Sequence, residues 1–187
     1  ADTAVFVVAR ESGEGADRKN TEGDYLLSRE EKENLRILSE HFKSLIVLLN
    51  VGGQMDTSYL RSLPNLSALV FSGQAAGVTG LAAADVLTGK VVPEGKLVDT
   101  WAENYHDYPN SENFAALNGD LDDEWYTEGI YVGYRYFDSF GIAPAYPFGY
   151  GLSYTGFSIS DRSVYKENGK LVVKAAVSNT GTLYEGR

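Results

Sequence analysis

The spacing of hydrophobic residues predicts alternating strands and helices in the first part of the chain. Three short apolar runs, rich in β-branched and aromatic residues, are typical of strands buried in a parallel sheet; they cover 4–9, 45–49 and 68–71. Between the first two, Ser28-Arg29-Glu30-Glu31 has the pattern of a capping box, and apolar residues at helical spacing follow it, which predicts a helix over 29–42. A strand, a helix and a strand in this order indicate a βαβ unit.

The same pattern continues less regularly towards the C-terminus. A short helical turn is expected over 57–61. A helix is expected to begin at the small residues of 72–77 and to end at Gly89, and another strand is expected over 96–101. The segment 103–127 is polar and without lasting periodicity, and loops of this length are usually functional or docked on something. The run 128–138 is interpreted as aromatic-rich strand interleaved with glycine.

The last part of the chain has a residue pattern typical of an all-β domain. Strands are expected over 157–165 and 171–177, joined by Asn168-Gly169, which is a strong hairpin signal. The fold class predicted for the chain is therefore α/β, with a mostly parallel sheet flanked by helices over 1–155. The first strands of a β-sandwich are expected over 156–187.

Charge and composition narrow the classes of ligand. The 187 residues carry a formal net charge of −10, which disfavours nucleic acid and anionic membrane surfaces as partners and suits a neutral ligand such as a sugar. There are no cysteines, so disulfides, zinc–thiolate sites and thiol catalysis are excluded, while the cellular compartment stays open. The chain lacks an initiator Met and begins almost inside a strand, so we expect it to be a fragment.

No cofactor or metal site is expected from the motifs. The segment 72–77 matches neither a dinucleotide-binding fingerprint nor a P-loop with its lysine. His106 has no second histidine or cysteine at metal-binding spacing. The acidic residues near the middle of the chain lack the spacing of a calcium loop, so a solvated loop is favoured for them; they are Asp120, Asp122, Asp123 and Glu124.

The candidate chemistry lies directly after the first predicted strand, in Ser12-Gly13-Glu14-Gly15-Ala16-Asp17-Arg18. Ligands of open α/β sheets bind outside the carboxyl ends of the strands, and glycines on both sides of Glu14 would let this carboxyl project into a cleft. Asp17 and Arg18 are expected to form an ion pair that holds the loop. On spacing alone, a tight turn with a solvated acid explains the same residues.

The run 10–18 resembles the acid/base loop of glycoside hydrolase family 3, the retaining β-glucosidases and their relatives. Three other segments resemble family runs in the same order: 89–97, which contains Pro93-Glu94-Gly95-Lys96-Leu97; 128–138; and 146–155. Ala102 departs from the family, which usually has proline there. The resemblance implies that Glu14 is the general acid/base and that the loop is supported by Ser12, Gly13, Gly15, Asp17 and Arg18.

The resemblance also implies a domain organisation and a set of partners. The chain would hold an α/β-sandwich domain without its opening portion and the start of a fibronectin type III-like domain. The nucleophilic aspartate would lie on a separate (β/α)8 barrel of the same enzyme. The implied activity is that of a retaining, exo-acting β-glycosidase, most simply a β-glucosidase that takes β-linked gluco-oligosaccharides or aryl glucosides.

Several alternatives remain open from the sequence. The parent enzyme could have β-xylosidase specificity, or the chain could be a sugar-binding or interface domain without a catalytic role, or an unrelated nucleotide-binding protein of flavodoxin type. Glu11 is the nearest rival to Glu14. The aromatic residues of the C-terminal half are expected to form an interdomain seam rather than a platform for sugars, and a seam left uncovered would favour a homo-oligomer; they are Tyr131, Tyr134, Tyr136, Phe148 and Tyr150.

Overall fold

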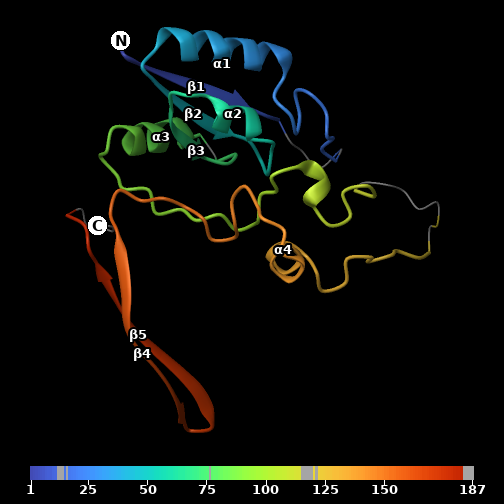
Figure 1. The fold of residues 1–187 in the computed structure, drawn as a ribbon, viewed down its shortest axis with the longest axis vertical. Coiled ribbons are helices and arrows are strands. Elements are labelled where there is room, and N and C mark those ends of the chain that lie inside the picture. The colour runs from blue at the N-terminus through green and yellow to red at the C-terminus, as the bar shows by residue number, and fades with distance from the viewer. Residues whose placement is uncertain (12–14, 16, 76, 115–119, 121, 183–187) are drawn as a thin grey trace. The chain divides into compact units, whose positions relative to one another are not determined.

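The computed structural model describes residues 1–11, 15, 17–75, 77–114, 120 and 122–182. The elements, in chain order, are β1 (Thr3–Ala9), α1 (Arg29–His41), β2 (Ser44–Asn50), α2 (Ser58–Ser62), β3 (Leu66–Phe71), α3 (Thr79–Leu87), the 3-10 helix η1 (Tyr105–Asp107), α4 (Tyr134–Phe140), β4 (Phe157–Glu167) and β5 (Lys170–Asn179) (Figure 1). They belong to two compact units, Ala1–Thr79 with Leu97–Tyr150, and Gly80–Lys96 with Gly151–Arg187. The domain boundary expected at 155 stays a prediction.

The first unit is built on a parallel three-stranded sheet in the order β1-β2-β3, as predicted. Ala4 pairs with Leu45 and Val8 with Leu49 between the first two strands, and a register irregularity separates Leu45 from Ile46 where β2 pairs with β3. Because all three strands run in one direction, their carboxyl ends lie at the same edge of the sheet. The loops that follow β1, β2 and β3 therefore begin close together.

The hydrophobic core lies on one face of this sheet. Val8 of β1 and the alternate residues Leu45, Val47 and Leu49 of β2 are at most 1% exposed, and Leu35 of α1 packs into the same cluster. Helix α1 runs along this face of the sheet (Figure 1). Residues two apart on a strand point to the same face, so this alternation fixes which side of the sheet is covered.

The opposite face of β1 is more open than the sequence predicted. Val5 and Val7 are 51% and 49% exposed, whereas a continuous apolar run was expected to be buried on both faces. At β1, which is an edge strand of the sheet, only the face towards α1 is covered.

Helix α1 begins with the capping box that the sequence predicted. The Glu31 amide donates to Ser28 Oγ at 3.1 Å, and the Ser28 amide donates to Glu31 Oε2 at 2.8 Å. These two bonds satisfy backbone donors that have no partner inside the helix. The helix ends at His41, and the amide of Phe42 donates to Leu38 O.

The second unit contains the antiparallel hairpin of β4 and β5, and its predicted turn is confirmed. Asn168 and Gly169 both have positive φ, 50° and 77°, as a two-residue hairpin turn matched to the twist of the strands requires. Within this unit, Tyr154 Oη also donates to Val86 O of α3 at 3.0 Å.

The expected strand over 96–101 is wrong. Within this range, only Trp101 pairs as a β-bridge, with Tyr146. The same two segments are also joined by a hydrogen bond from the amide of Leu97 to Tyr150 O at 2.8 Å. The partner segment contains Pro147, which has no N–H to donate, and Gly149 with φ 78°, so a continuous ladder cannot form.

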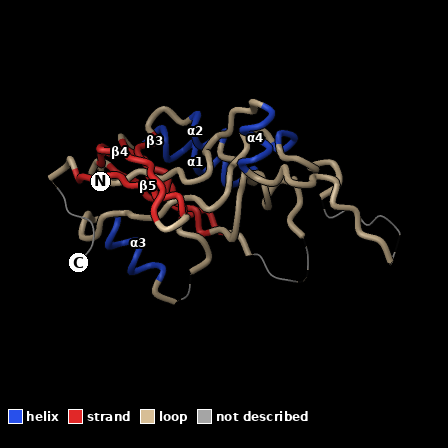
Figure 2. Tube along the Cα trace, turned by 90° about the horizontal axis from the view of Figure 1, so that it is seen from below, coloured by secondary structure: helices blue, strands red, loops and turns tan. Residues whose placement is uncertain are grey.

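The expected strand over 128–138 is also wrong: residues 128–133 form turns and loop, and the chain then forms helix α4. Tyr134, Phe137 and Phe140 recur at intervals of three, which is helical spacing, and Phe137 is the buried member of the set. Gly133 and Gly141 flank the helix with positive φ of 57° and 67°. The described residues between α3 and α4 are mostly loop and turn, including those of the segment 103–127 (Figure 2).

Replacement of Leu35 by alanine tests the core. Because this side chain is fully buried, Leu35→Ala should lower the free energy of unfolding by about 2–5 kcal/mol in urea denaturation. Ile37→Ala, two positions along the same helix, is the matched control; Ile37 is 40% exposed and its loss should be below about 1.5 kcal/mol. Equal losses for the two variants would contradict a core on this face of α1.

Candidate active site

The candidate loop leaves the sheet at the edge where all three strands end. The amide of Arg10 continues the ladder by one bond to Asn50 O at 3.1 Å, and the amide of Ser72 donates to Leu49 O at 3.0 Å. Gln74 Nε2, in the segment after β3, donates to Arg10 O at 2.6 Å. The segment after β3 therefore contacts the start of the segment after β1.

Arg10 fixes the first end of the loop. Its side chain is 8% exposed and forms a bidentate ion pair with Glu31, with Nη1–Oε1 and Nη2–Oε2 distances of 2.6 and 2.7 Å. Its Nε also donates to Asp24 O at 2.9 Å. Since Glu31 is the capping residue of α1, this arginine joins the end of β1 to the start of the helix.

Arg18 fixes the other end of the loop. Its Nε donates to Asp24 Oδ1 at 2.7 Å, its Nη2 donates to Asp24 O at 3.0 Å, and its Nη1 donates to Gln54 O in the segment after β2. The expected ion pair between Asp17 and Arg18 is wrong, because Arg18 pairs with Asp24 instead. Asp24 offers both a carboxylate and a carbonyl oxygen to the same guanidinium, which the fork of donors on arginine matches well.

Both arginines donate to the same main-chain oxygen, Asp24 O. We call Arg10, Arg18, Asp24 and Glu31 the loop clamp, because together they hold the two ends of the segment 11–17. The charge-assisted bonds of a clamp of this kind are stronger than neutral hydrogen bonds.

The tip of the loop is only partly described. Ser12, Gly13 and Glu14 lie outside the described residues, and the role of Glu14 stays a prediction. Gly15, Asp17 and the rival Glu11 are described and exposed.

The two carboxylates of the clamp are held in their ionised forms. Burial raises the pKa of Glu31, but hydrogen bonds from Arg10 and from the Ser28 amide, with the charge of Arg10, outweigh burial and lower the pKa overall. In Asp24, burial likewise raises the pKa, and the Lys19 amide and Arg18 outweigh it. A carboxyl that is ionised well below neutral pH has no proton to donate there, so neither group suits general acid catalysis.

Metal chemistry finds no support within the described ranges. No group of three or more His, Cys, Asp or Glu side chains in that part of the chain could hold a metal ion. His106 lies 2.8 Å from Glu112, and Asp120 Oδ1 accepts from the amides of Asp122 and Asp123. Nor does any helix among the residues described have the length and apolar character of a membrane span.

The sequence did not identify the residues that the clamp and its neighbours use as acceptors. No sequence motif marked Asp24, Gln54 or Gln74 as a hydrogen-bond partner. Several of the acceptors are main-chain carbonyl oxygens, such as Asp24 O and Gln54 O, which every residue type has. The one available signal was Glu31, whose capping-box position was predicted and which also binds Arg10.

The aromatic residues of the expected seam lie largely at the surface of the chain. Tyr131, Tyr134, Phe148 and Tyr150 are 38–53% exposed, and Tyr136 is half-buried. Their part in an interdomain seam stays a prediction.

The fold and the loop together define an α/β domain that presents a glutamate-containing loop at the carboxyl edge of a parallel sheet. Residues 1–134 match the family model described as the glycosyl hydrolase family 3 C-terminal domain. This chain therefore belongs to glycoside hydrolase family 3.

Similar proteins agree with this assignment. Beta-glucosidase A of Butyrivibrio fibrisolvens is 41% identical over 186 residues, covering 86% of this chain and 22% of that protein. A beta-glucosidase of Ruminococcus albus is 42% identical over 183 residues, covering 97% and 19% respectively. The structure of beta-glucosidase 3B from Thermotoga neapolitana in complex with glucose is similar with a TM-score of 0.85 and 43% identity, over 96% of this chain and 26% of that one. The chain thus spans about a fifth to a quarter of the length of these relatives.

Replacement of Glu31 by glutamine tests the clamp through its dependence on pH. At pH 7, Glu31→Gln leaves Arg10 buried without its charge partner and should lower the free energy of unfolding by about 2–4 kcal/mol in urea denaturation. The folded-state pKa of Glu31 lies below its unfolded value, so the contribution of its charge is complete above that unfolded value and is lost as the pH falls through the folded one. The difference between wild type and variant should therefore shrink on acidification from pH 6 to pH 3.

Glu22→Gln is the matched control. Glu22 pairs with Lys32 at 3.5 Å, but its side chain is 60% exposed, so its loss should cost less than about 1 kcal/mol. If the cost of Glu31→Gln did not change with pH, the charge of Glu31 would not be what stabilises the clamp.

Proposed function

We propose that this chain supplies the general acid/base, Glu14, of a retaining, exo-acting β-glucosidase whose nucleophilic aspartate lies on a separate (β/α)8 barrel domain. The substrates would be β-linked gluco-oligosaccharides or aryl glucosides. One observation carries the proposal: a glycine-flanked glutamate lies between two arginines that are anchored at the carboxyl edge of the sheet. The similarity to beta-glucosidases of Butyrivibrio fibrisolvens and Ruminococcus albus favours glucosides over xylosides.

The reaction needs two carboxyl groups with different tasks. In retaining glycosidases these groups lie about 5 Å apart, one as nucleophile and one as acid and then base. Glu14 would donate its proton to the glycosidic oxygen while the aspartate attacks the anomeric carbon. It would then take a proton from the water that hydrolyses the glycosyl-enzyme, so that configuration is retained after two inversions.

The clamp suits this role because it neutralises its own charges. A nearby uncompensated arginine would lower the pKa of Glu14 and leave it without the proton that the first step needs. Arg10 is paired with Glu31, and Arg18 with Asp24. The two arginines can thus hold the ends of the loop while adding little net positive charge near Glu14.

The substitution Glu14→Ala in the enzyme that includes the barrel tests the role of Glu14. Loss of the general acid should slow glycosyl transfer by about 10²–10⁴-fold for poor leaving groups and much less for activated aryl leaving groups, which depart without a proton. With activated substrates the glycosyl-enzyme should accumulate, because its hydrolysis has lost the base. Azide, which needs no deprotonation, should then restore turnover and give a β-glycosyl azide.

Glu11→Ala is the matched control for Glu14→Ala, since Glu11 is the other glutamate in the same loop and is exposed. It should have a modest effect that is uniform across leaving groups. If Glu14→Ala slowed good and poor leaving groups alike without azide rescue, and Glu11→Ala showed the leaving-group dependence, the role would belong to Glu11.

The 187-residue chain on its own should not turn over an aryl β-glucoside. Without the nucleophile of the barrel, an acid/base has no double-displacement route. The measurement is release of the aryl alcohol by rigorously purified chain, with the chain carrying Glu14→Ala as the control for contaminating enzyme. Release by the wild-type chain that Glu14→Ala abolished would show that the chain holds both carboxyl groups.

A further inference from the structure

A cavity in the first unit has a lining of unusual chemistry. Its volume is about 230 Å³, and it is lined by residues from the loop after η1, from 127–131 and from α4; these are Pro109, Asn110, Thr127, Glu128, Tyr131, Tyr136 and Phe140. None of them belongs to the loop 10–18. Pockets for drug-sized ligands begin at about 300 Å³, so a cavity of this size suits a ligand with a single ring.

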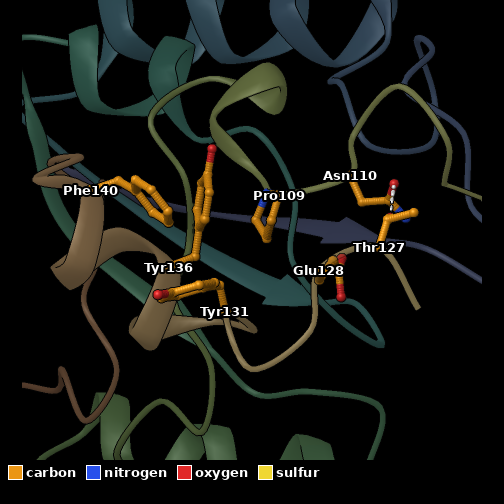
Figure 3. Close-up of a pocket in the computed structure, with 7 residues that line it drawn as sticks. All are labelled: Pro109, Asn110, Thr127, Glu128, Tyr131, Tyr136 and Phe140. Atoms are coloured by element: carbon orange, nitrogen blue, oxygen red, sulfur yellow. Dashed lines mark hydrogen bonds between the residues drawn. The ribbon is translucent and has the colours of Figure 1, made fainter.

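The lining is divided into an aromatic side and a polar side. Figure 3 shows Tyr131, Tyr136 and Phe140 on one side of Pro109, and the polar group of Asn110, Thr127 and Glu128 on the other. Tyr136 and Phe140 come from successive turns of α4, which places them on the same face of the helix.

The three rings form one aromatic cluster, in which Phe140 contacts both tyrosines. The centroids of Tyr131 and Phe140 lie 5.1 Å apart with an interplanar angle of 65°, and those of Tyr136 and Phe140 lie 4.9 Å apart at 47°. Tyr131 and Phe140 are still 41% and 58% exposed, so this packing leaves ring surface accessible. The rings are inclined to one another and do not surround a common centre, which favours a ligand face stacked on one ring over a cation held in an aromatic cage.

The polar side supplies acceptors and a donor without a positive charge. Thr127 Oγ1 donates to Asn110 Oδ1 at 3.1 Å, which leaves the amide nitrogen of Asn110 as a donor (Figure 3). Among the described residues, Glu128 has no Lys, Arg or His within ion-pair distance. A carboxylate in this position accepts hydrogen bonds from hydroxyl groups and repels anions.

We propose that this cavity is a binding site for a single pyranose unit of a neutral sugar. A pyranose has an apolar C–H face, which would stack on the aromatic surface, and a rim of hydroxyl groups, which would bond to Glu128 and Asn110. For Tyr131 and Tyr136 this proposal replaces the interdomain seam expected from the sequence, and it does not depend on the role of Glu14. The site would give the chain a means of holding glucose or the terminal unit of a β-glucan that is independent of hydrolysis.

Titration of the 187-residue chain with glucose and with cellobiose tests the proposal, followed by NMR of the aromatic side chains. We expect saturable binding with Kd on the order of 1–10 mM and shifts of the ring signals of Tyr131, Tyr136 and Phe140. Tyr131→Ala and Glu128→Gln should each weaken binding by about fivefold or more, the scale of one aromatic contact or one hydrogen bond to a charged group. Tyr131→Phe, which keeps the ring, should retain most of the affinity even if Tyr131→Ala disturbs the local fold.

The matched controls lie in the same loop but do not line the cavity. Tyr126→Ala removes a tyrosine that is 87% exposed, and Glu124→Gln removes an exposed carboxylate; both should bind as the wild type does. Glu14→Gln should also bind normally, which separates this site from the proposed acid/base. The proposal would be overturned by no saturable binding of either sugar up to about 100 mM, by binding that the cavity variants leave unchanged, or by binding of choline in place of sugar.

Discussion

The main-chain oxygen of Asp24 accepts hydrogen bonds from two arginines, and the arrangement of the candidate active site depends on this one acceptor. Arg10 comes directly from the end of β1, and Arg18 from the far end of the loop, so the two stems are held beside each other. Through Glu31 the same network reaches the first turn of α1. A strand end, a helix start and the candidate loop thus share one set of charge-assisted bonds, and the core cluster that contains Leu35 and Val8 lies beneath β1 and α1.

The proposed function would place opposite demands on carboxyl groups that lie close in sequence. Asp24 and Glu31 have to stay ionised, and their arginine partners lower the pKa of both. An acid/base has to hold its proton near neutral pH, which requires burial or a neighbouring negative charge. Pairing each arginine with its own carboxylate separates these demands, because the charges cancel within the clamp.

Local sequence signals predicted the parts of the fold that depend on local physics. The capping box at Ser28 and Glu31, the turn at Asn168 and Gly169 and the three parallel strands are all confirmed, because each is determined by neighbouring residues or by a short apolar run. The strand expected over 96–101 failed for a non-local reason, since Pro147 interrupts the ladder from the partner segment. In the candidate site, the glycines in the sequence identified the loop, but Asp17 was wrongly expected to be the ion-pair partner of Arg18. The true partner, Asp24, is selected by a turn that brings a carbonyl and a carboxylate together, and this geometry has no sequence motif.

Fixed ends also change what the loop can tolerate over evolutionary time. Closing a flexible loop costs free energy that grows only with the logarithm of its length, about 0.6 kcal/mol for each doubling. With Arg10 and Arg18 both bonded to Asp24 O, that closure is secured by side chains outside the segment 11–17. Insertions and substitutions between the two arginines are therefore cheap for the fold, and selection can alter the length and chemistry of this segment while the sheet keeps its register. The clamp therefore lets this edge of the domain vary in sequence and length at little cost to the stability of the sheet.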